Sequence, residues 1–375
     1  MNPTRMSIEL RDQNGVLIKV LNKLVKGLTW EYDRIGGCGR ATLSLAAPYD
    51  FFQDNIGPDY DVRIWLEDET GIAKLWYRGY VESHKPTLQD NDSIDLSLFG
   101  YVGQLKRVRV AKTYSGMEVS AIVKDILDTL VIPSTDITYS SSDIVDTGFS
   151  VDTLTFDTMA DSALKTLADL AGSYEWGVDV NKNFFFKPLS TVIRHYLRIG
   201  KEITLYDSLD DYSQIVNRIY LKGKNTNGIT FEDQIDNTES QESYGLRSQV
   251  VSNSAILTSA VSQKYGSGLL ADQARVTRRI SITVPKNLKF YESQLPLGSL
   301  SIITKTLPAS KKYGDSDAIY GTFKYAGTPS FQIDKLAYKL ANEGVDLTIQ
   351  AGSQRPNIYL QIKQLQFEID QLRSN

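Results

Sequence analysis

Apolar and polar residues alternate in two regions of this chain, and the alternating runs follow the same order in both regions. Each region has a run that ends in proline, then a turn with glycine and a second run, and finally a hairpin that leads to a third run ending near glycine. The landmarks are Arg40–Pro48, Asn55–Ile64, Tyr77–Gly79 and Ser93–Gly100 in the first region, and Arg278–Pro285, Leu295–Ile303, Tyr325–Gly327 and Gly344–Gly352 in the second. Period-two alternation is typical of strands with one buried face.

The shared order favours an internal duplication over a generic β meander. The alignment of the two regions makes Leu96 equivalent to Leu347 and Val62 equivalent to Leu300. Turn-forming residues at short intervals predict a small β-barrel or sandwich over residues 1–105. A second barrel is expected over residues 201–352.

The second copy is expected to open with Asp211–Lys224 and then to be interrupted. Residues 225–274 are polar, with a helix expected around Ala255–Lys264 and a break at Tyr265–Gly268. The first copy has only the short turn Arg34–Arg40 at the corresponding place. We interpret 225–274 as an excursion from the second barrel, and long excursions are more often contact elements than linkers.

Residues 106–200 change character and predict an α+β module between the two barrels. Ser115 and Glu118 have the spacing of a capping box at the start of a helix, and Pro133 ends its apolar pattern. A second helix is expected over Thr158–Ala171, followed by two strands joined in a tight turn. The basic run Lys106–Lys112 is interpreted as a strand with one solvated side.

Residues 353–375 predict an amphipathic C-terminal helix. Its apolar residues are spaced alternately by four and three, which is the seam of a coiled coil. The seam consists of Ile358, Ile362, Leu365, Ile369 and Leu372. A helix lying on its own domain is the alternative. Isoleucine at a with leucine at d favours a coiled coil of two helices, whereas the assembly inferred below has three chains.

Composition and candidate chemistry point away from catalysis. The 375 residues carry a formal net charge of -4, which argues against a dedicated nucleic-acid binder. No signal peptide or membrane-spanning run is expected. Cys38, His84 and His195 form no motif for a nucleophile or a metal, and the acidic run Asp90–Asp95 lacks the glycine and glutamate of a calcium loop. We expect no catalytic, metal or cofactor-binding residues, although no pattern excludes a carboxylate pair of the kind that glycosidases use.

Three segments resemble the hub proteins of phage tails and baseplates, whose architecture type VI secretion spikes share. They are Asp157–Pro188 with its helix and hairpin, Asp211–Gly223, and Ile333–Leu372 with a closing strand and helix. The resemblance implies a mainly β fold in which two tail-tube-like barrels flank the α+β module. The chain stops soon after the helix, whereas many relatives continue into a fibre or spike.

The resemblance also implies a structural, non-enzymatic role in the virion. Three copies of a chain with two similar barrels close a ring of six units, which can join a sixfold tube to a threefold tip. The implied partners are two further copies of the chain, a tail-tube or distal-tail ring, the tape measure protein, a central spike or fibre, and DNA that passes through the lumen without specific binding. The implied place is the virion, after synthesis in the host cytoplasm. A tail-associated hydrolase or polysaccharide-binding protein is the alternative.

Overall fold

The computed structural model describes most of the chain from residue 6 to residue 352. The described ranges are 6–46, 56–67, 72–87, 92–172, 174–190, 193–198, 202–224, 229–252, 259–274, 277–285, 297, 299–303, 330–341 and 344–352. The predicted helix at 353–375, with its seam of Ile358, Ile362, Leu365, Ile369 and Leu372, lies outside these ranges. The coiled coil therefore stays a prediction.

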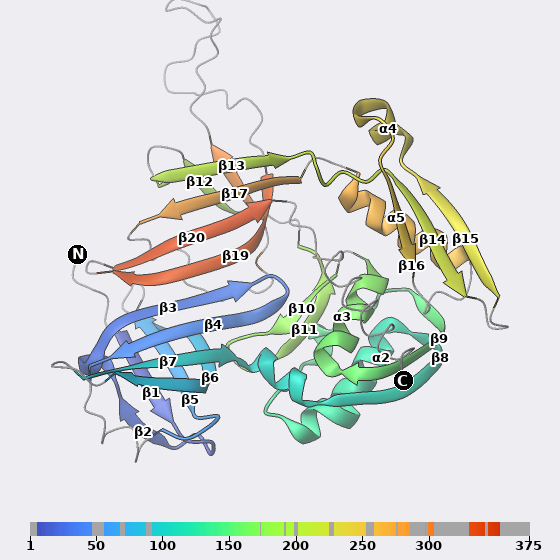
Figure 1. The fold of residues 1–375 in the computed structure, drawn as a ribbon. Coiled ribbons are helices and arrows are strands. Elements are labelled where there is room, and N and C mark those ends of the chain that lie inside the picture. Colours follow the sequence, from blue (N-terminus) through green and yellow to red (C-terminus); the bar gives the residue numbers. More distant parts are fainter. Residues whose placement is uncertain are drawn as a thin grey trace, which may run out of the picture.

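A long, mainly antiparallel sheet runs through the molecule and confirms the mainly β expectation (Figure 1). Its first strands are β1 (Met6–Arg11), β2 (Leu17–Val20), β3 (Val25–Asp33), β4 (Gly36–Leu45), β5 (Asp61–Glu67), β6 (Ala73–Thr87) and β7 (Ser93–Gly100). Its later strands are β12 (Ile193–Arg198), β13 (Leu205–Asp211), β17 (Thr277–Val284), β18 (Ser299–Ile303), β19 (Ser330–Ala341) and β20 (Gly344–Gly352). Side chains alternate between a buried and a more polar face, as on β7, where Ile94, Leu96 and Leu98 are buried.

The strand order in this sheet occurs twice. A first set is ordered β3-β4-β7-β6-β5, and a second set is ordered β13-β17-β20-β19-β18. Each neighbouring pair within a set is antiparallel. The third and fourth strands of both sets also share a bulge, at Glu82 between Val81 and Ser83 on β6, and at Asp334 between Ile333 and Lys335 on β19.

The bulges fix which residues of the two sets correspond. Val62 pairs with Gly79, two residues before Val81, and Leu300 pairs with Phe331, two residues before Ile333, so the expected match of Val62 with Leu300 is confirmed. The expected match of Leu96 with Leu347 is wrong by two residues.

Leu96 lies opposite Leu43, and the strand partners and the bulge together match it to Ile349. A shift of two keeps every apolar residue on the same face, so the alternation alone does not detect it. Among the described strands neither set closes on itself, and both belong to one open sheet.

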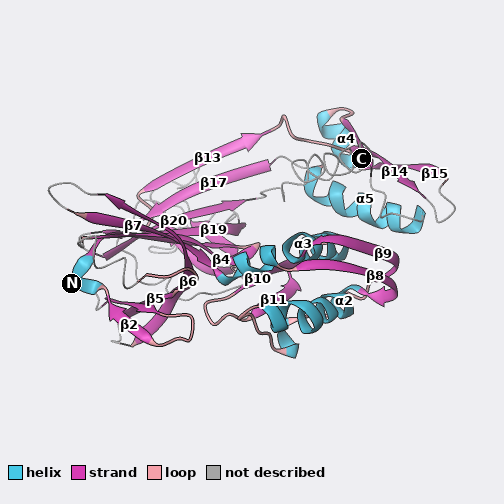
Figure 2. Cartoon of the chain, turned by 60° about the horizontal axis from the view of Figure 1, so that its bottom comes forward, coloured by secondary structure: helices cyan, strands magenta, loops and turns pink. Residues whose placement is uncertain are grey.

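The middle of the chain forms a compact α+β module beside the first set (Figure 2). Its strands are β8 (Arg109–Glu118), β9 (Ser150–Met159), β10 (Tyr174–Val178) and β11 (Phe184–Pro188), and its helices are α2 (Val119–Ile126) and α3 (Ala160–Ala171). The helix-plus-hairpin expectation is confirmed, and Gly172 follows α3 with a positive φ of 66°. The capping box is wrong, because Glu118 is itself the N-cap of α2 and accepts a hydrogen bond from the Ala121 amide.

The basic run Lys106–Lys112 is a strand only in its second half, from Arg109 onwards. Its first half belongs to the 3-10 turn Tyr101–Arg107, which packs its apolar residues into the core of the module.

The excursion between β13 and β17 is a small folded unit with its own apolar core. Its elements are β14 (Arg218–Lys224), β15 (Thr230–Asp236), α4 (Thr238–Tyr244), β16 (Ser248–Ser252) and α5 (Ser259–Gln273). Because β14 pairs with β15 and β16, the expectation that Asp211–Lys224 opens the second barrel is wrong, and β13 occupies that place.

The expected break at Tyr265–Gly268 is also wrong, since α5 continues through it. Gly266 packs so closely on β15 that an added Cβ would lie 2.7 Å from Ile235 Cδ1. Tertiary packing therefore overrides the low helix propensity of the two glycines.

The module is attached to the long sheet through β10, which pairs in parallel with the start of β4. Gly37 lies at this contact with a φ of 80°, and a Cβ there would lie 2.3 Å from the Val178 carbonyl oxygen. Gly15 has the same φ of 80° but no atom within 4 Å of the Cβ position. A substitution at Gly15 therefore tests backbone strain alone, whereas the same substitution at Gly37 adds steric overlap with Val178.

We predict that Gly37→Ala destabilises the protein much more than Gly15→Ala. The Gly15 change should cost about 1 kcal/mol, from the left-handed backbone alone. The Gly37 change should cost at least about 2 kcal/mol more, because β10 must move away from β4. Urea unfolding of both variants measures the difference, and equal losses would contradict the close contact.

Candidate assembly interface

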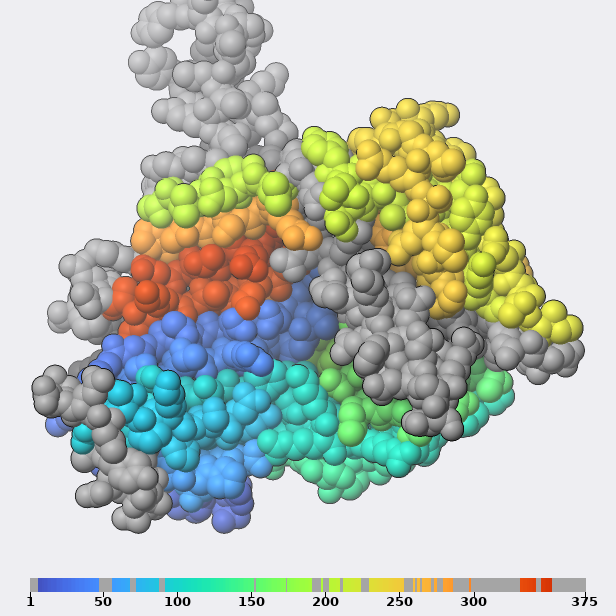
Figure 3. Space-filling view, viewed as in Figure 1, coloured from blue at the N-terminus to red at the C-terminus, as the bar shows by residue number. Residues whose placement is uncertain are grey.

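The two sets of strands meet edge to edge where β19 pairs with β3. The antiparallel register runs from Lys335 opposite Asp33 to Lys339 opposite Thr29. Figure 3 shows the red surface of β19 directly beside the blue surface of β3, although the two strands are far apart in the sequence. The Arg34 amide donates to the Asp334 carbonyl at 2.8 Å, and the Arg34 guanidinium lies 2.7 Å from the Asp334 carboxylate. This junction makes one continuous sheet from both sets.

A cluster of aromatic rings lies beneath the junction on the buried face of the sheet. Tyr338 of β19 stacks on Trp30 of β3 with ring centroids 5.2 Å apart and planes inclined by 7°. Trp76 and Tyr32 contact the Tyr338 ring edge to face, at 5.4 Å and 5.8 Å. All four side chains are at most 1% exposed, so the junction is part of the core. Aromatic pairs of this geometry contribute about 0.5–1.5 kcal/mol each beyond the burial of their area.

Two strand edges of the same sheet have no partner among the described residues. β6 pairs with β5 through Ala73–Tyr80, and the Val81 amide on the same edge donates to the Tyr60 carbonyl at 2.9 Å. From Glu82 onwards, β6 pairs only with β7 on the other side. Glu82, Ser83, His84 and Lys85 are exposed there. At the far end of the sheet β13 pairs with β17 alone, and Leu205 and Leu209 are 53% and 58% exposed. The open half of β6 and the open edge of β13 are the candidate interface.

A buried ion cluster joins the first set to the module. Asp61 accepts hydrogen bonds from Arg63 Nε at 2.7 Å, Arg78 Nε at 3.0 Å and the Tyr101 hydroxyl at 2.9 Å. Lys182, in the turn between β10 and β11, lies 4.1 Å from the centre of the Tyr101 ring. Burial alone would raise the pKa of Asp61, but the hydrogen bonds from both arginines outweigh it and the pKa is lowered. Asp61 is therefore a structural carboxylate that stays ionised.

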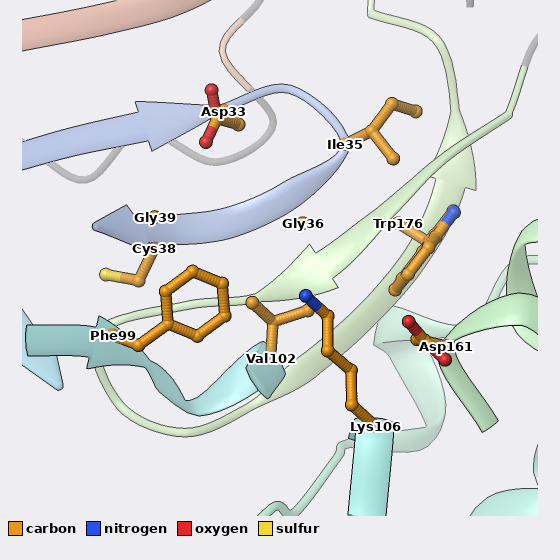
Figure 4. Close-up of a pocket in the computed structure, with 10 residues that line it drawn as sticks. All are labelled: Asp33, Ile35, Gly36, Cys38, Gly39, Phe99, Val102, Lys106, Asp161 and Trp176. Carbon is orange, nitrogen blue, oxygen red and sulfur yellow. The ribbon is translucent and has the colours of Figure 1, made fainter. Parts of the chain in front are cut away.

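A pocket of about 180 Å³ lies between the long sheet and the module (Figure 4). Asp33 and Asp161 reach it from opposite sides, with Lys106, Phe99 and Trp176 around them. Burial raises the pKa of Asp33 to about 6, although the charge of Lys335 opposes this rise. The pocket is smaller than the roughly 300–1,000 Å³ of sites that enclose drug-sized ligands.

The structure places the cysteine and the two histidines on three different strands. Cys38 is fully buried near the start of β4, directly after Gly36 and Gly37, and burial raises the pKa of its thiol to about 12. His84 is exposed on β6. His195 lies on β12. Of the acidic run, residues 90 and 91 lie outside the described ranges, and β7 begins at Ser93.

Clusters of metal-ligating side chains and long apolar helices are both missing from the described ranges. No group of three or more His, Cys, Asp or Glu side chains there is arranged to hold a metal ion. None of the helices described is long and apolar enough to span a membrane.

Sequence reasoning missed both the junction and the open edges. Trp30 and Tyr338 read as ordinary strand residues, and no local pattern tells which two strands will be neighbours. β13 gave a usable signal, since Leu205 and Leu209 share one face of a strand while the apolar Tyr206 lies on the other. Apolar residues on both faces of a strand indicate that both faces become covered, which neither face of an ordinary outer strand requires.

We predict that Asp61→Asn destabilises the protein by about 3 kcal/mol at neutral pH, because it leaves two half-buried arginines without their buried carboxylate. A carboxyl group with a lowered folded pKa contributes stability above its unfolded pKa of about 3.9, and this stability is lost as the pH falls through the folded value. The gap between wild type and variant should therefore narrow below about pH 4. Thermal unfolding across that range measures it.

Asp59→Asn is the matched control. Asp59 also binds an arginine, Arg107, but the two side chains are 35% and 50% exposed. Its loss should cost less than about 1 kcal/mol. Equal effects at both positions would contradict the role of burial.

Comparison with known proteins gives structural matches only. No protein-family model and no curated protein matches the sequence. A tail protein from Neisseria meningitidis has a TM-score of 0.65 at 11% identity, over 92% of this chain and 96% of that one. The 43 kDa tail protein of prophage MuSo2 from Shewanella oneidensis has a TM-score of 0.61 at 13% identity, over 92% and 97%. Prophage tail protein gp18 from Listeria monocytogenes has a TM-score of 0.60 at 14% identity, over 97% and 99%. Along nearly its whole length, this chain has the fold of phage tail proteins.

Proposed function

We propose that the chain is a structural protein of a phage tail, located in the virion at the tail tip or baseplate. In this proposal three copies form a hub whose strand sets, descended from one duplicated barrel, make a ring of six similar units. The observation that carries it is the recurrence of one strand order, β3-β4-β7-β6-β5 and β13-β17-β20-β19-β18, within a single sheet. A chain that contains two repeating units of a ring needs only three copies to complete six.

Such a ring would connect components of different symmetry. On one side it would mate with the sixfold ring of a tail tube or distal tail protein and meet the tape measure protein. On the other side it would present threefold symmetry to a central spike or fibre. We propose the division into barrels at 1–105 and 201–352, with the module at 106–200 between them.

The polar face of the sheet is suited to a lumen. Thr29 and Thr42 share a hydrogen bond across β3 and β4 at 2.6 Å, and Ser44 donates to Asp95 at 2.6 Å across β4 and β7. Lys335 pairs with Glu31 across the junction. Charges of both signs that already have partners leave little for a phosphate backbone to bind, so DNA would pass without being held.

We propose no catalytic step for this assembly. A tail-associated hydrolase or polysaccharide binder is the alternative, and assays on peptidoglycan and capsular sugar test it. Cleavage that disappears in an Asp33→Asn, Asp161→Asn variant would assign an activity to the pocket of Figure 4.

We predict that the purified protein forms a trimer with a central hole. Light scattering coupled to size exclusion should give three times the chain mass of 42.0 kDa, and negative-stain images should show a ring with threefold symmetry. A monomer at all concentrations, or a closed dimer, would contradict the proposal.

We predict that deletion of residues 357–375 leaves the ring but weakens it. The seam Ile358, Ile362, Leu365, Ile369 and Leu372 would otherwise join the three chains on the axis, and a seam this short is marginal alone. Light scattering on dilution measures the loss. A truncated protein that is as trimeric as the full chain would show that the helix only covers its own domain.

A further inference from the structure

We infer that the open half of β6 in one copy pairs antiparallel with the open edge of β13 in the next copy, and that this pairing closes the ring. The inference rests on the proposed ring and names the contact that makes it. β19 pairs with β18 through its first residues and with β3 through its later ones. β6 pairs with β5 in the same way through its first residues, and from Glu82 onwards this edge of β6 has no partner among the described residues. The strand equivalent to β3 in the second set is β13, whose outer edge is open as well.

The internal junction supplies the register of this contact. The shared bulge makes Lys85 of β6 equivalent to Ala337 of β19. The register of β3 against β4 and of β13 against β17 makes Ser208 equivalent to Trp30. The next residues along the two strands, Leu209 and Glu31, are therefore equivalent as well. Since Ala337 lies opposite Glu31, Lys85 would lie opposite Leu209 of the neighbouring copy.

The chemistry of the two edges is complementary in this register. Lys85 would lie diagonally across from Asp207 of the neighbour, on the face that Asp207 shares with Leu209. Diagonal neighbours on one face of an antiparallel pair are about 7–8 Å apart, within the reach of a lysine side chain. The aliphatic stem of Lys85 would cover the exposed Leu209 side chain. Charged edges resist indiscriminate pairing, so a complementary pair of edges selects one partner.

The same comparison predicts that this contact is weaker than the internal junction. On the buried face, Pro86 takes the place of Tyr338 and Ser208 takes the place of Trp30. Neither position adds aromatic area, and Pro86 has no amide hydrogen for the ladder. The edges can thus remain in water before assembly, and the contact forms between complete, folded chains.

A cysteine cross-link tests the register in the full-length protein. Lys85→Cys and Leu209→Cys are made as separate variants, mixed, and oxidised. Residues directly opposite in an antiparallel pair have Cα atoms about 4.5–5.5 Å apart, which a disulfide can span. The mixture should give a covalent dimer on a non-reducing gel, and either variant alone should give none.

Leu205→Cys is the matched negative control, because Leu205 is equally exposed on the same face of β13. It lies four residues from Leu209, about 13 Å along the strand, beyond the reach of a disulfide. Glu31→Cys with Ala337→Cys in one chain is the positive control, since these residues are opposite each other in the internal junction. Wild-type protein is the control for cross-links through the native Cys38, which is buried.

Each outcome decides the inference. A cross-link with Leu209→Cys but not with Leu205→Cys supports the pairing and its register. Trimers that form no Lys85–Leu209 cross-link, while the positive control oxidises, overturn the inference and leave the proposed hub intact. A cross-link at Leu205 overturns the register. Protein that stays monomeric overturns both the inference and the proposed function.

Discussion

The stacking of Tyr338 on Trp30 is the contact on which the rest of the structure depends. It joins a strand near the end of the chain to one near its start, and Trp76 and Tyr32 close around it. Because these rings are fully buried, the two strand sets share one apolar core and cannot move independently. A ring assembled from paired units needs such a permanent junction. If the two units of a chain pivoted on each other, the open edges at the ends of the sheet would not reach their neighbours in a fixed register.

The contrast between that junction and the open edges follows from when each forms. The internal junction lies within one chain, so its apolar rings are removed from water as the chain folds. It can therefore use four aromatic side chains. In the proposed assembly, the open edges of β6 and β13 would face water until another copy binds, and a row of large apolar residues there would promote aggregation. Charged residues, a proline and two leucines on β13 occupy these edges instead. Solubility before assembly thus limits how strong any contact through these edges can be.

Much of the fold was predictable from period-two alternation, and its errors have one physical origin. The alternation located the strands of both sets and matched Val62 to Leu300. It misplaced Leu96 by two residues, because a shift of two preserves every inward side chain. It assigned Arg218–Lys224 to the long sheet, because an alternating strand does not reveal which sheet it joins. The junction between β19 and β3 was invisible for the same reason, since pairing between residues about 300 positions apart is decided by packing in the folded chain.

The module and the excursion lie beside equivalent turns of the two strand sets, and this determines what symmetry the proposed ring would present. In the first set, β10 of the module pairs with the start of β4, next to the turn from β3. In the second set, the connection from β13 to β17 carries the excursion with β14, β15 and β16. Figure 1 shows both at the same end of the strands, the module below and the excursion above. Around the proposed ring of six units, the module and the excursion would alternate. That end of the ring would therefore be threefold, while the opposite strand ends, without such insertions among the described residues, would keep a nearly sixfold outline. In the proposed ring, the difference between the module and the excursion at this one end of the strands would be enough to convert sixfold into threefold symmetry.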